Sequence, residues 1–115
     1  MASFDRLDVV VVPFPFTNAD ITKRRPALAL SGAAWVQAHA HGTFAMITSA
    51  RHSRWPSDVT IQKPEAAGLR APSMVRWKLF TLPAVLVERR LGALDSADRT
   101  NVFAALRELF GLEDR

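Results

Sequence analysis

The chain has 115 residues, enough for one domain with its own core and too few for two, so we expect a single domain over residues 1–115. It has no cysteine, which excludes disulfides, zinc ribbons and thiol nucleophiles. Its 49% hydrophobic and 23% charged residues are typical of a globular protein. No apolar run approaches the ~18 residues of a membrane span, and the N-terminus, with Asp5 and Asp8, has no signal-peptide pattern. We therefore expect a cytoplasmic protein without membrane contact.

Positive charge is concentrated in the middle of the chain. Between residues 21 and 80, nine basic residues stand against Asp58 and Glu65, whereas the two ends together hold six basic and nine acidic residues. A basic region between acidic ends indicates a polyanionic partner, with nucleic acid as the first candidate. Scattered, solvated cations are the alternative explanation.

The first third of the chain contains the most informative segment. The β-branched run Val9–Val12 and the apolar run Ala27–Leu30 are bounded by prolines and are typical of buried strands. The far end of the loop between them carries three consecutive cations, which are Lys23, Arg24 and Arg25. Because Lys and Arg are rarely buried without a partner, this basic triplet predicts a surface for an anion.

Further along the chain, short strands alternate with turns. We expect a short helix over Ala33–Ala40, strands over Phe44–Thr48 and Asp58–Ile61, a turn or 3₁₀ segment over Pro64–Leu69, and one long or two kinked strands over Ser73–Leu82.

A final helix is predicted to begin at Asp95 or Ser96 and to end near Phe110, with Gly111 in the stop position. Five apolar residues share one face of it and predict packing on the rest of the protein: Val102, Phe103, Leu106, Leu109 and Phe110. Several short strands and one terminal helix indicate a mainly β fold, a small curved sheet or partly closed barrel.

Five pieces of sequence, in this order, give the chain a family resemblance. They are Asp8–Thr17 (DVVVVPFPFT), Lys23–Leu28 (KRRPAL), Ile47–Ser49 (ITS), Pro72–Leu82 (PSMVRWKLFTL) and Arg89–Gly92 (RRLG). Over nearly its whole length, the chain resembles the PemK/MazF-type toxins of bacterial toxin–antitoxin pairs.

This resemblance implies an SH3-like β-barrel of the CcdB/PemK type with a C-terminal helix, assembled as a homodimer. It also implies a metal-independent endoribonuclease without a cofactor, which cuts single-stranded RNA at short sequences. The products are a 2′,3′-cyclic phosphate and a 5′-hydroxyl, and a cognate antitoxin blocks the groove. The family's catalytic arginine carries over to Arg25 and its catalytic threonine or serine to Thr48, with Ser49 beside it.

The chemistry of Arg25 and Thr48 suits this reaction. The 2′-hydroxyl attacks the adjacent phosphorus, and negative charge builds up on the non-bridging oxygens. A guanidinium is always charged and binds phosphate with two parallel donors, and a threonine hydroxyl can donate to the same group. The alternatives are a solvated cation or a non-catalytic phosphate clamp for Arg25, and a packing role for Thr48.

The residue that accepts the 2′-hydroxyl proton stays open. Arginine cannot release its proton. His52 lies in a basic loop four residues after Thr48, and histidine changes charge near neutral pH. Asp20 and water are the alternatives. His39 and His41 would need further ligands to hold a metal, and a surface position is favoured for all three histidines.

A second cluster follows at residues 76–78. Arg76 is expected to match an arginine that supports catalysis in some family members, but Lys78 stands where its acidic partner would be. The strand is therefore expected to add phosphate contacts. Trp77 is favoured as a core residue, and Trp55 as the residue that stacks on a base. The predicted RNA-binding residues are Lys23, Arg24, Arg51, Arg54, Trp55 and Lys78.

Two other functions remain open at this point. A related toxin with the same barrel poisons DNA gyrase, so the fold alone does not imply a nuclease. A non-catalytic nucleic-acid-binding barrel is the other alternative. The KRRP motif and the central positive charge favour an RNA-cutting or RNA-binding protein over a gyrase poison.

Overall fold

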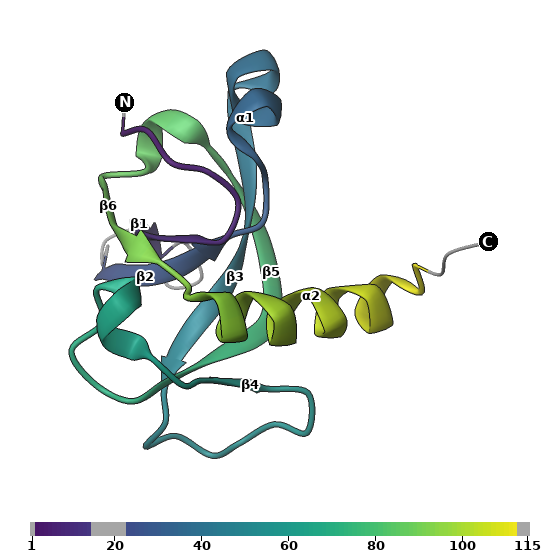
Figure 1. Cartoon of the computed structure of the whole chain (residues 1–115). Coiled ribbons are helices and arrows are strands. Elements are labelled where there is room, and N and C mark those ends of the chain that lie inside the picture. The colour runs from purple at the N-terminus through teal and green to yellow at the C-terminus, as the bar shows by residue number, and fades with distance from the viewer. Residues whose placement is uncertain (1, 15–22, 113–115) are drawn as a thin grey trace.

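Six antiparallel strands and one long helix make up most of the described chain (Figure 1). The computed structural model describes residues 2–14 and 23–112. In chain order the elements are β1 (Asp8–Phe14), β2 (Lys23–Ala29), α1 (Ala33–His39), β3 (His41–Ser49), β4 (Val59–Ile61), the 3₁₀ turn η1 (Pro64–Ala67), β5 (Ser73–Pro83), the 3₁₀ turn η2 (Ala84–Leu86), β6 (Arg89–Ala93) and α2 (Ser96–Phe110). The strands form one sheet in the order β4-β5-β3-β2-β1-β6, curled into a half-barrel. The predicted mainly β barrel with a C-terminal helix is confirmed.

Strand β1 is buried on both of its faces. Val10 and Val12 join one apolar core, which contains Phe44, and Val9 joins a second core, which contains Leu28. All three valines are fully buried. A strand that is covered on both faces needs apolar residues at every position, which explains why β1 is a continuous run of valines.

The basic triplet lies inside β2, which corrects the prediction that it ends the preceding loop. Strand β2 begins at Lys23, and Pro26 is paired with Val11 in the middle of the strand. Strand β3 pairs with β2 only from Ala27 to Ala29, so one side of β2 is open at Pro26. Strands tolerate proline where one side lacks a partner, and the proline therefore does not mark the start of the strand.

The long strand β5 runs beside β3 and has a bulge in its middle. Ala45 pairs with Leu79 and Met46 with Arg76, so two extra residues of β5 lie between these pairs. A bulge bends the strand and increases its twist. Of the two arrangements predicted for Ser73–Leu82, the single long strand is the one observed.

The 3₁₀ turn η1 packs against β6 and closes the curled sheet on that side. A Cβ at Gly92 would lie 2.7 Å from the carbonyl oxygen of Ala66, and a Cβ at Gly68 would overlap the carbonyl of Leu91. Gly68 also has a φ of +74°, in the left-handed region that favours glycine. Strand β6 is not predicted from the sequence, because it depends on pairing with β1 from the other end of the chain.

Helix α2 begins and ends where the sequence predicts. Asp95 is the N-cap, and its carboxylate accepts a hydrogen bond from the backbone N–H of Asp98 at 3.0 Å. Gly111 ends the helix with a φ of +64°. The buried Asp98 carboxylate accepts hydrogen bonds from the backbone N–H groups of Gln62 at 2.9 Å and Lys63 at 3.0 Å, and these bonds tie the helix to the end of β4.

Helix α2 packs against the core as far as Leu106, but its last turn does not. Val102 is fully buried, and Phe103 and Leu106 pack against the same core. Leu109 and Phe110 are 45% and 55% exposed, so the prediction that the whole apolar face packs is wrong for the last turn. The reason is that α2 extends beyond the sheet (Figure 1).

The short helix α1 confirms the helix predicted over residues 33–40. It ends at His39, and its C-cap Ala40 has a φ of +60°. Among the described residues, no helix combines the length and the apolar character needed to cross a membrane.

Candidate functional site

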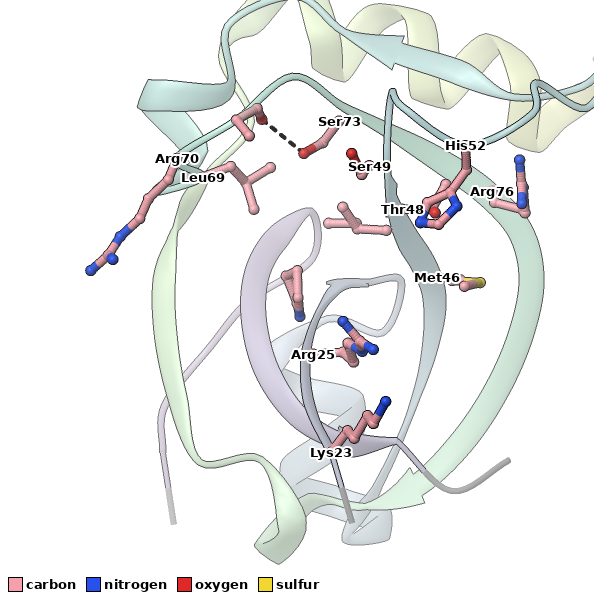
Figure 2. A pocket seen from close by; sticks show the side chains of 13 residues that line it. Lys23, Arg25, Met46, Thr48, Ser49, His52, Leu69, Arg70, Ser73 and Arg76 are labelled. Carbon is pink, nitrogen blue, oxygen red and sulfur yellow. Dashed lines mark hydrogen bonds between the residues drawn. The ribbon is translucent and has the colours of Figure 1, made fainter. Parts of the chain in front are cut away.

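A groove of about 570 Å³ lies between β2, the end of β3 and the start of β5 (Figure 2). It is lined by Lys23, Arg25, Pro26, Met46, Ile47, Thr48, Ser49, His52, Leu69, Arg70, Ala71, Ser73 and Arg76. None of these lining residues is acidic, and the set includes two lysine or arginine side chains from β2 and two from the β5 side. The groove is therefore suited to an anion.

The groove brings together residues that are up to 53 positions apart, between 23 and 76. Six of the predicted site residues line it, which are Lys23, Arg25, Thr48, Ser49, His52 and Arg76. Five others do not line it, which are Arg24, Arg51, Arg54, Trp55 and Lys78.

Arg25 and Arg24 point to different surroundings although they are neighbours in β2. Side chains alternate between the two faces of a strand. Arg24 donates from Nε to Glu88 Oε1 at 2.6 Å. Arg25 lines the groove, is exposed, and makes no hydrogen bond or ion pair with the other described residues. Its donors are therefore available to a ligand.

Thr48 and Ser49 lie at the end of β3, on the other side of the groove from Lys23 and Arg25 (Figure 2). Thr48 is only 8% exposed, and its hydroxyl makes no hydrogen bond within the described part of the chain. Ser49 Oγ accepts a hydrogen bond from the backbone N–H of Arg51 at 3.2 Å. Thr48 thus offers a hydroxyl to the groove, while Ser49 also shapes the turn after β3.

Arg76 has an acidic partner, which corrects the expectation that Lys78 had displaced it. The partner is Asp58 from another segment: Arg76 Nε donates to Oδ1 at 3.1 Å and Nη2 to Oδ2 at 2.8 Å. Nη2 also donates to the carbonyl oxygen of Ser53 at 2.6 Å. The Asp58 side chain is fully buried and that of Arg76 is 9% exposed. This is a bidentate, buried ion pair.

The ion pair keeps both groups charged. Burial raises the pKa of Asp58, but the hydrogen bonds from Arg76 and from the backbone N–H of Trp55 outweigh burial, and the net pKa is lowered. The hydrogen bond to Asp58 raises the pKa of Arg76 despite desolvation. Asp58 is therefore a weak base and is unsuited to accept a proton at neutral pH.

The loop over residues 50–58 is held by hydrogen bonds to its own end. The backbone N–H of Trp55 donates to Asp58 Oδ2 at 2.8 Å. Arg54 donates to the Asp58 carbonyl oxygen and to Thr60 Oγ1, both at 2.9 Å. These contacts give Arg54 a structural role beside the RNA-binding role predicted for it, and they fix the loop next to the groove.

Trp55 remains 41% exposed although one face of its ring is covered. The guanidinium carbon of Arg76 lies 4.2 Å from the ring centroid, and Lys78 Nζ lies 5.9 Å from it. Trp77 packs against the second core, which confirms the core interpretation. Trp77 is therefore a partly buried residue at the edge of this core, whereas the stacking role of Trp55 stays a prediction.

Three further groove residues, Leu69, Arg70 and Ser73, have no local motif that marks them as site residues. They line the groove because the chain between η1 and β5 runs along the edge of the groove. In the sequence, Arg70 contributes only to the central positive charge. Ser73 Oγ donates to the Ala71 carbonyl oxygen at 2.9 Å, so it stabilises this turn.

The remaining candidates from the sequence are Asp20 as a base and His39 and His41 as metal ligands. Asp20, considered as a base, lies outside the described residues. His39 and His41 are exposed and lie at the opposite end of β3 from the groove. Within residues 2–14 and 23–112, no three His, Cys, Asp or Glu side chains are grouped to hold a metal ion.

A comparison with protein families identifies the chain. The family model described as "PemK-like, MazF-like toxin of type II toxin-antitoxin system" matches residues 5–110. The chain belongs to this toxin family. The match spans every residue that lines the groove of this PemK/MazF-like chain, and the resemblance seen in its sequence is confirmed.

Solved structures share the fold of this PemK/MazF-like toxin. An endoribonuclease in complex with its cognate antitoxin, from Mycobacterial species, is 18% identical over 100% of both chains, with a TM-score of 0.76. MazE–MazF from Deinococcus radiodurans is 23% identical over 95% of this chain and 97% of that chain, with a TM-score of 0.74. Mycobacterium tuberculosis toxin MazF-mt6 is 24% identical over 93% of this chain and 99% of that chain, with a TM-score of 0.70. The comparison with curated proteins gives no match.

Proposed function

We propose that this chain is the toxin of a type II toxin–antitoxin pair and acts as a metal-independent endoribonuclease on single-stranded RNA. One observation carries the proposal: a groove without acidic lining residues places the exposed guanidinium of Arg25 opposite the hydroxyl of Thr48. The solved relatives described as endoribonucleases supply the activity by similarity. The reaction is a transesterification that yields a 2′,3′-cyclic phosphate and a 5′-hydroxyl.

In this scheme each groove residue meets one part of the scissile phosphate. Arg25 donates two parallel hydrogen bonds to the non-bridging oxygens and stabilises the charge that develops on them. Thr48 donates a third hydrogen bond and helps to hold the 2′-oxygen, phosphorus and 5′-oxygen in line. Lys23 and Arg70 attract the neighbouring phosphates of the strand. We leave Arg24 out of this surface, because Glu88 holds its side chain elsewhere.

We also propose the partners of this toxin. A cognate antitoxin would cover the groove, since relatives of the same fold are described in complex with theirs. The basic lining favours an acidic segment of that partner. We further propose that the toxin is a homodimer that acts on RNA in the cytoplasm.

A gyrase poison and a non-catalytic RNA-binding barrel are the other candidates. The family match and the relatives described as endoribonucleases do not favour a gyrase poison. RNA with a single 2′-deoxy position separates cleavage from binding. Cleavage requires the 2′-hydroxyl at the cut site, whereas phosphate binding needs only the phosphates.

The decisive test compares Arg25→Ala with Arg24→Ala, its neighbour on the same strand. Purified proteins are incubated with mixed-sequence single-stranded RNA and EDTA, and the cut ends are mapped. We expect Arg25→Ala to cut ~10²–10³ times more slowly, because one phosphate donor is lost. We expect Arg24→Ala to cut like the wild type.

Circular dichroism checks that both variants are folded. Cutting by Arg25→Ala at the wild-type rate would contradict the catalytic assignment. A folded wild type that binds RNA and cuts neither the all-ribose strand nor its 2′-deoxy version would instead support the binding barrel. Inhibition of DNA supercoiling by gyrase when the purified protein is added would support the gyrase poison.

A further inference from the structure

The proposed reaction needs a group that accepts the proton of the attacking 2′-hydroxyl. Building on the proposed function, we propose that His52 is this general base. It lines the groove together with Arg25 and Thr48.

Few groove residues can accept a proton at neutral pH. The four charged residues that line the groove with His52 are all cations: Lys23 and Arg25 from β2, Arg70 from the segment before β5, and Arg76 from β5. The end of β3 contributes no charged residue to the lining. Lysine and arginine already carry their protons, and serine and threonine hydroxyls are not bases. Imidazole in its neutral form has a free lone pair on one ring nitrogen. Among the described lining residues, only His52 meets this requirement.

The carboxylate that contacts the groove residue Arg76 is already occupied. Asp58 does not line the groove, and its buried side chain binds Arg76 and the backbone N–H of Trp55. A carboxylate that already accepts these hydrogen bonds is a poor proton acceptor. The acidic residue that supports Arg76 is thus excluded as the base.

The turn after β3 brings His52 into the groove that Thr48 lines. The backbone N–H of His52 donates to the Ser49 carbonyl oxygen at 3.1 Å, which turns the chain back over the end of β3. Figure 2 shows the imidazole among the side chains that line the groove, together with Thr48 and Arg25. A phosphate held by Arg25 and Thr48 would therefore lie in the same groove as the imidazole.

The backbone around His52 is anchored on both sides. Arg51 donates its N–H to Ser49 Oγ at 3.2 Å before it, and Arg76 donates to the Ser53 carbonyl oxygen at 2.6 Å after it. Arg76 is itself held by its buried ion pair with Asp58. A catalytic base must keep a defined position to contribute, and these contacts fix the backbone that carries the imidazole. Arg76 acts here as a positioning residue.

The proposed step is balanced in atoms and charge. The neutral imidazole takes the 2′-hydroxyl proton while the 2′-oxygen forms a bond to phosphorus. The bond from phosphorus to the 5′-oxygen breaks, and this oxygen takes up a proton from solvent. The products are the 2′,3′-cyclic phosphate and the 5′-hydroxyl, and the imidazolium returns its proton to solvent.

The test measures single-turnover cleavage of an RNA with one cut site as a function of pH. For the wild type, we expect the rate to rise with pH and then level off, because only the neutral form of imidazole can accept a proton. His52→Gln should cut ~10²–10⁴ times more slowly and lose this rise. His41→Gln is the matched control, because His41 lies at the other end of β3, and it should keep the wild-type profile.

Two further measurements separate a base from a structural residue. Added imidazole should restore part of the activity of His52→Ala, which a merely structural role does not predict. A substrate with sulfur in place of the 5′-leaving oxygen needs no general acid. His52→Gln should therefore stay slow on this substrate, and full recovery would make His52 the acid and overturn the proposal.

The remaining outcomes are equally decisive. A wild-type rate and pH profile for folded His52→Gln would overturn the proposal, as would an Asp20→Asn variant that alone loses the rise with pH. Both results leave RNA cleavage by the wild type intact. Absence of cutting by the wild type would instead reject the proposed function, and the role of His52 with it.

Discussion

Two arginines of the groove differ in the number of donors that they have left for a ligand. Arg25 is exposed and has no partner among the described residues. Arg76 is 8% exposed and donates to Asp58 and Ser53. The same guanidinium chemistry therefore serves two purposes. Free donors can bind a phosphate, whereas occupied donors hold a loop in place.

The ion pair between Asp58 and Arg76 predicts a pH-dependent contribution to stability. Although burial opposes it, hydrogen bonding holds the pKa of Asp58 below the ordinary value of 3.8. A carboxyl group with a lowered folded-state pKa stabilises the protein fully above its unfolded-state pKa. This contribution is lost as the pH falls from 3.8 through the folded-state value.

We expect Asp58→Asn to lower the free energy of unfolding by about 3 kcal/mol at neutral pH. This is the lower end of the range for a broken buried pair, because Arg76 keeps its hydrogen bond to Ser53. The difference from the wild type should shrink in acid. Urea unfolding of both proteins at about pH 7 and about pH 3 measures it. An equal difference in the free energy of unfolding at the two pH values would rule out the ionisation of Asp58 as the cause of that difference.

At the scale of elements, α2 combines a part that packs on the core and a last turn that is exposed to solvent. Asp98 and Val102 are buried in the first half of the helix, whereas Leu109 and Phe110 are exposed in the last turn. Helical spacing places apolar residues on one face, but it does not reveal how far the partner surface extends. The same pattern therefore has different energetic consequences at the two ends.

We expect Val102→Ala to destabilise the protein by about 2 kcal/mol, because buried methyl groups are lost and a cavity is left. Leu109→Ala, the larger truncation on the same face, should cost less than about 0.5 kcal/mol, as exposed positions do. Thermal unfolding followed by circular dichroism compares them. Equal losses would mean that the last turn is also covered in solution.

At the scale of the whole molecule, the curled sheet is closed by backbone contact between η1 and β6. Two glycines allow this approach, Gly68 beside Leu91 and Gly92 beside Ala66. A Cβ at either glycine would meet backbone atoms at 2.7 Å or less, so the closeness of this contact depends on the absence of a Cβ. The turn η1 leads into the segment that carries Arg70, so this closure also shapes one wall of the groove.

Gly111 provides a matched control for Gly68. Both have a positive φ, but a Cβ at Gly111 would meet nothing within 4 Å. We expect Gly111→Ala to cost about 1 kcal/mol, the conformational penalty alone. Gly68→Ala should cost about 1–3 kcal/mol more, because a Cβ is forced against backbone. Urea unfolding measures both, and equal costs would show that η1 can move away from β6 freely.

Local rules in the sequence determined most of the elements of this protein. The valine run predicts β1, Asp95 and Gly111 predict the limits of α2, and the bent strand over Ser73–Leu82 follows from its apolar pattern. These features depend on neighbouring residues, whose sterics and periodicity can be recognised in a single chain. Arg25 and Thr48 were singled out through their sequence motifs, and the structure places both in one groove.

Tertiary structure alone decided the features that depend on distant residues. Pairing with β1 creates β6 and extends β2 back to Lys23, and the bond between Asp58 and Arg76 joins residues 18 positions apart. Arg70 and His52 reach the same groove only because β3 and β5 lie side by side. Long-range pairing of this kind leaves no periodic signal in the chain. Its free energy comes from burial and hydrogen bonds that form only in the folded sheet.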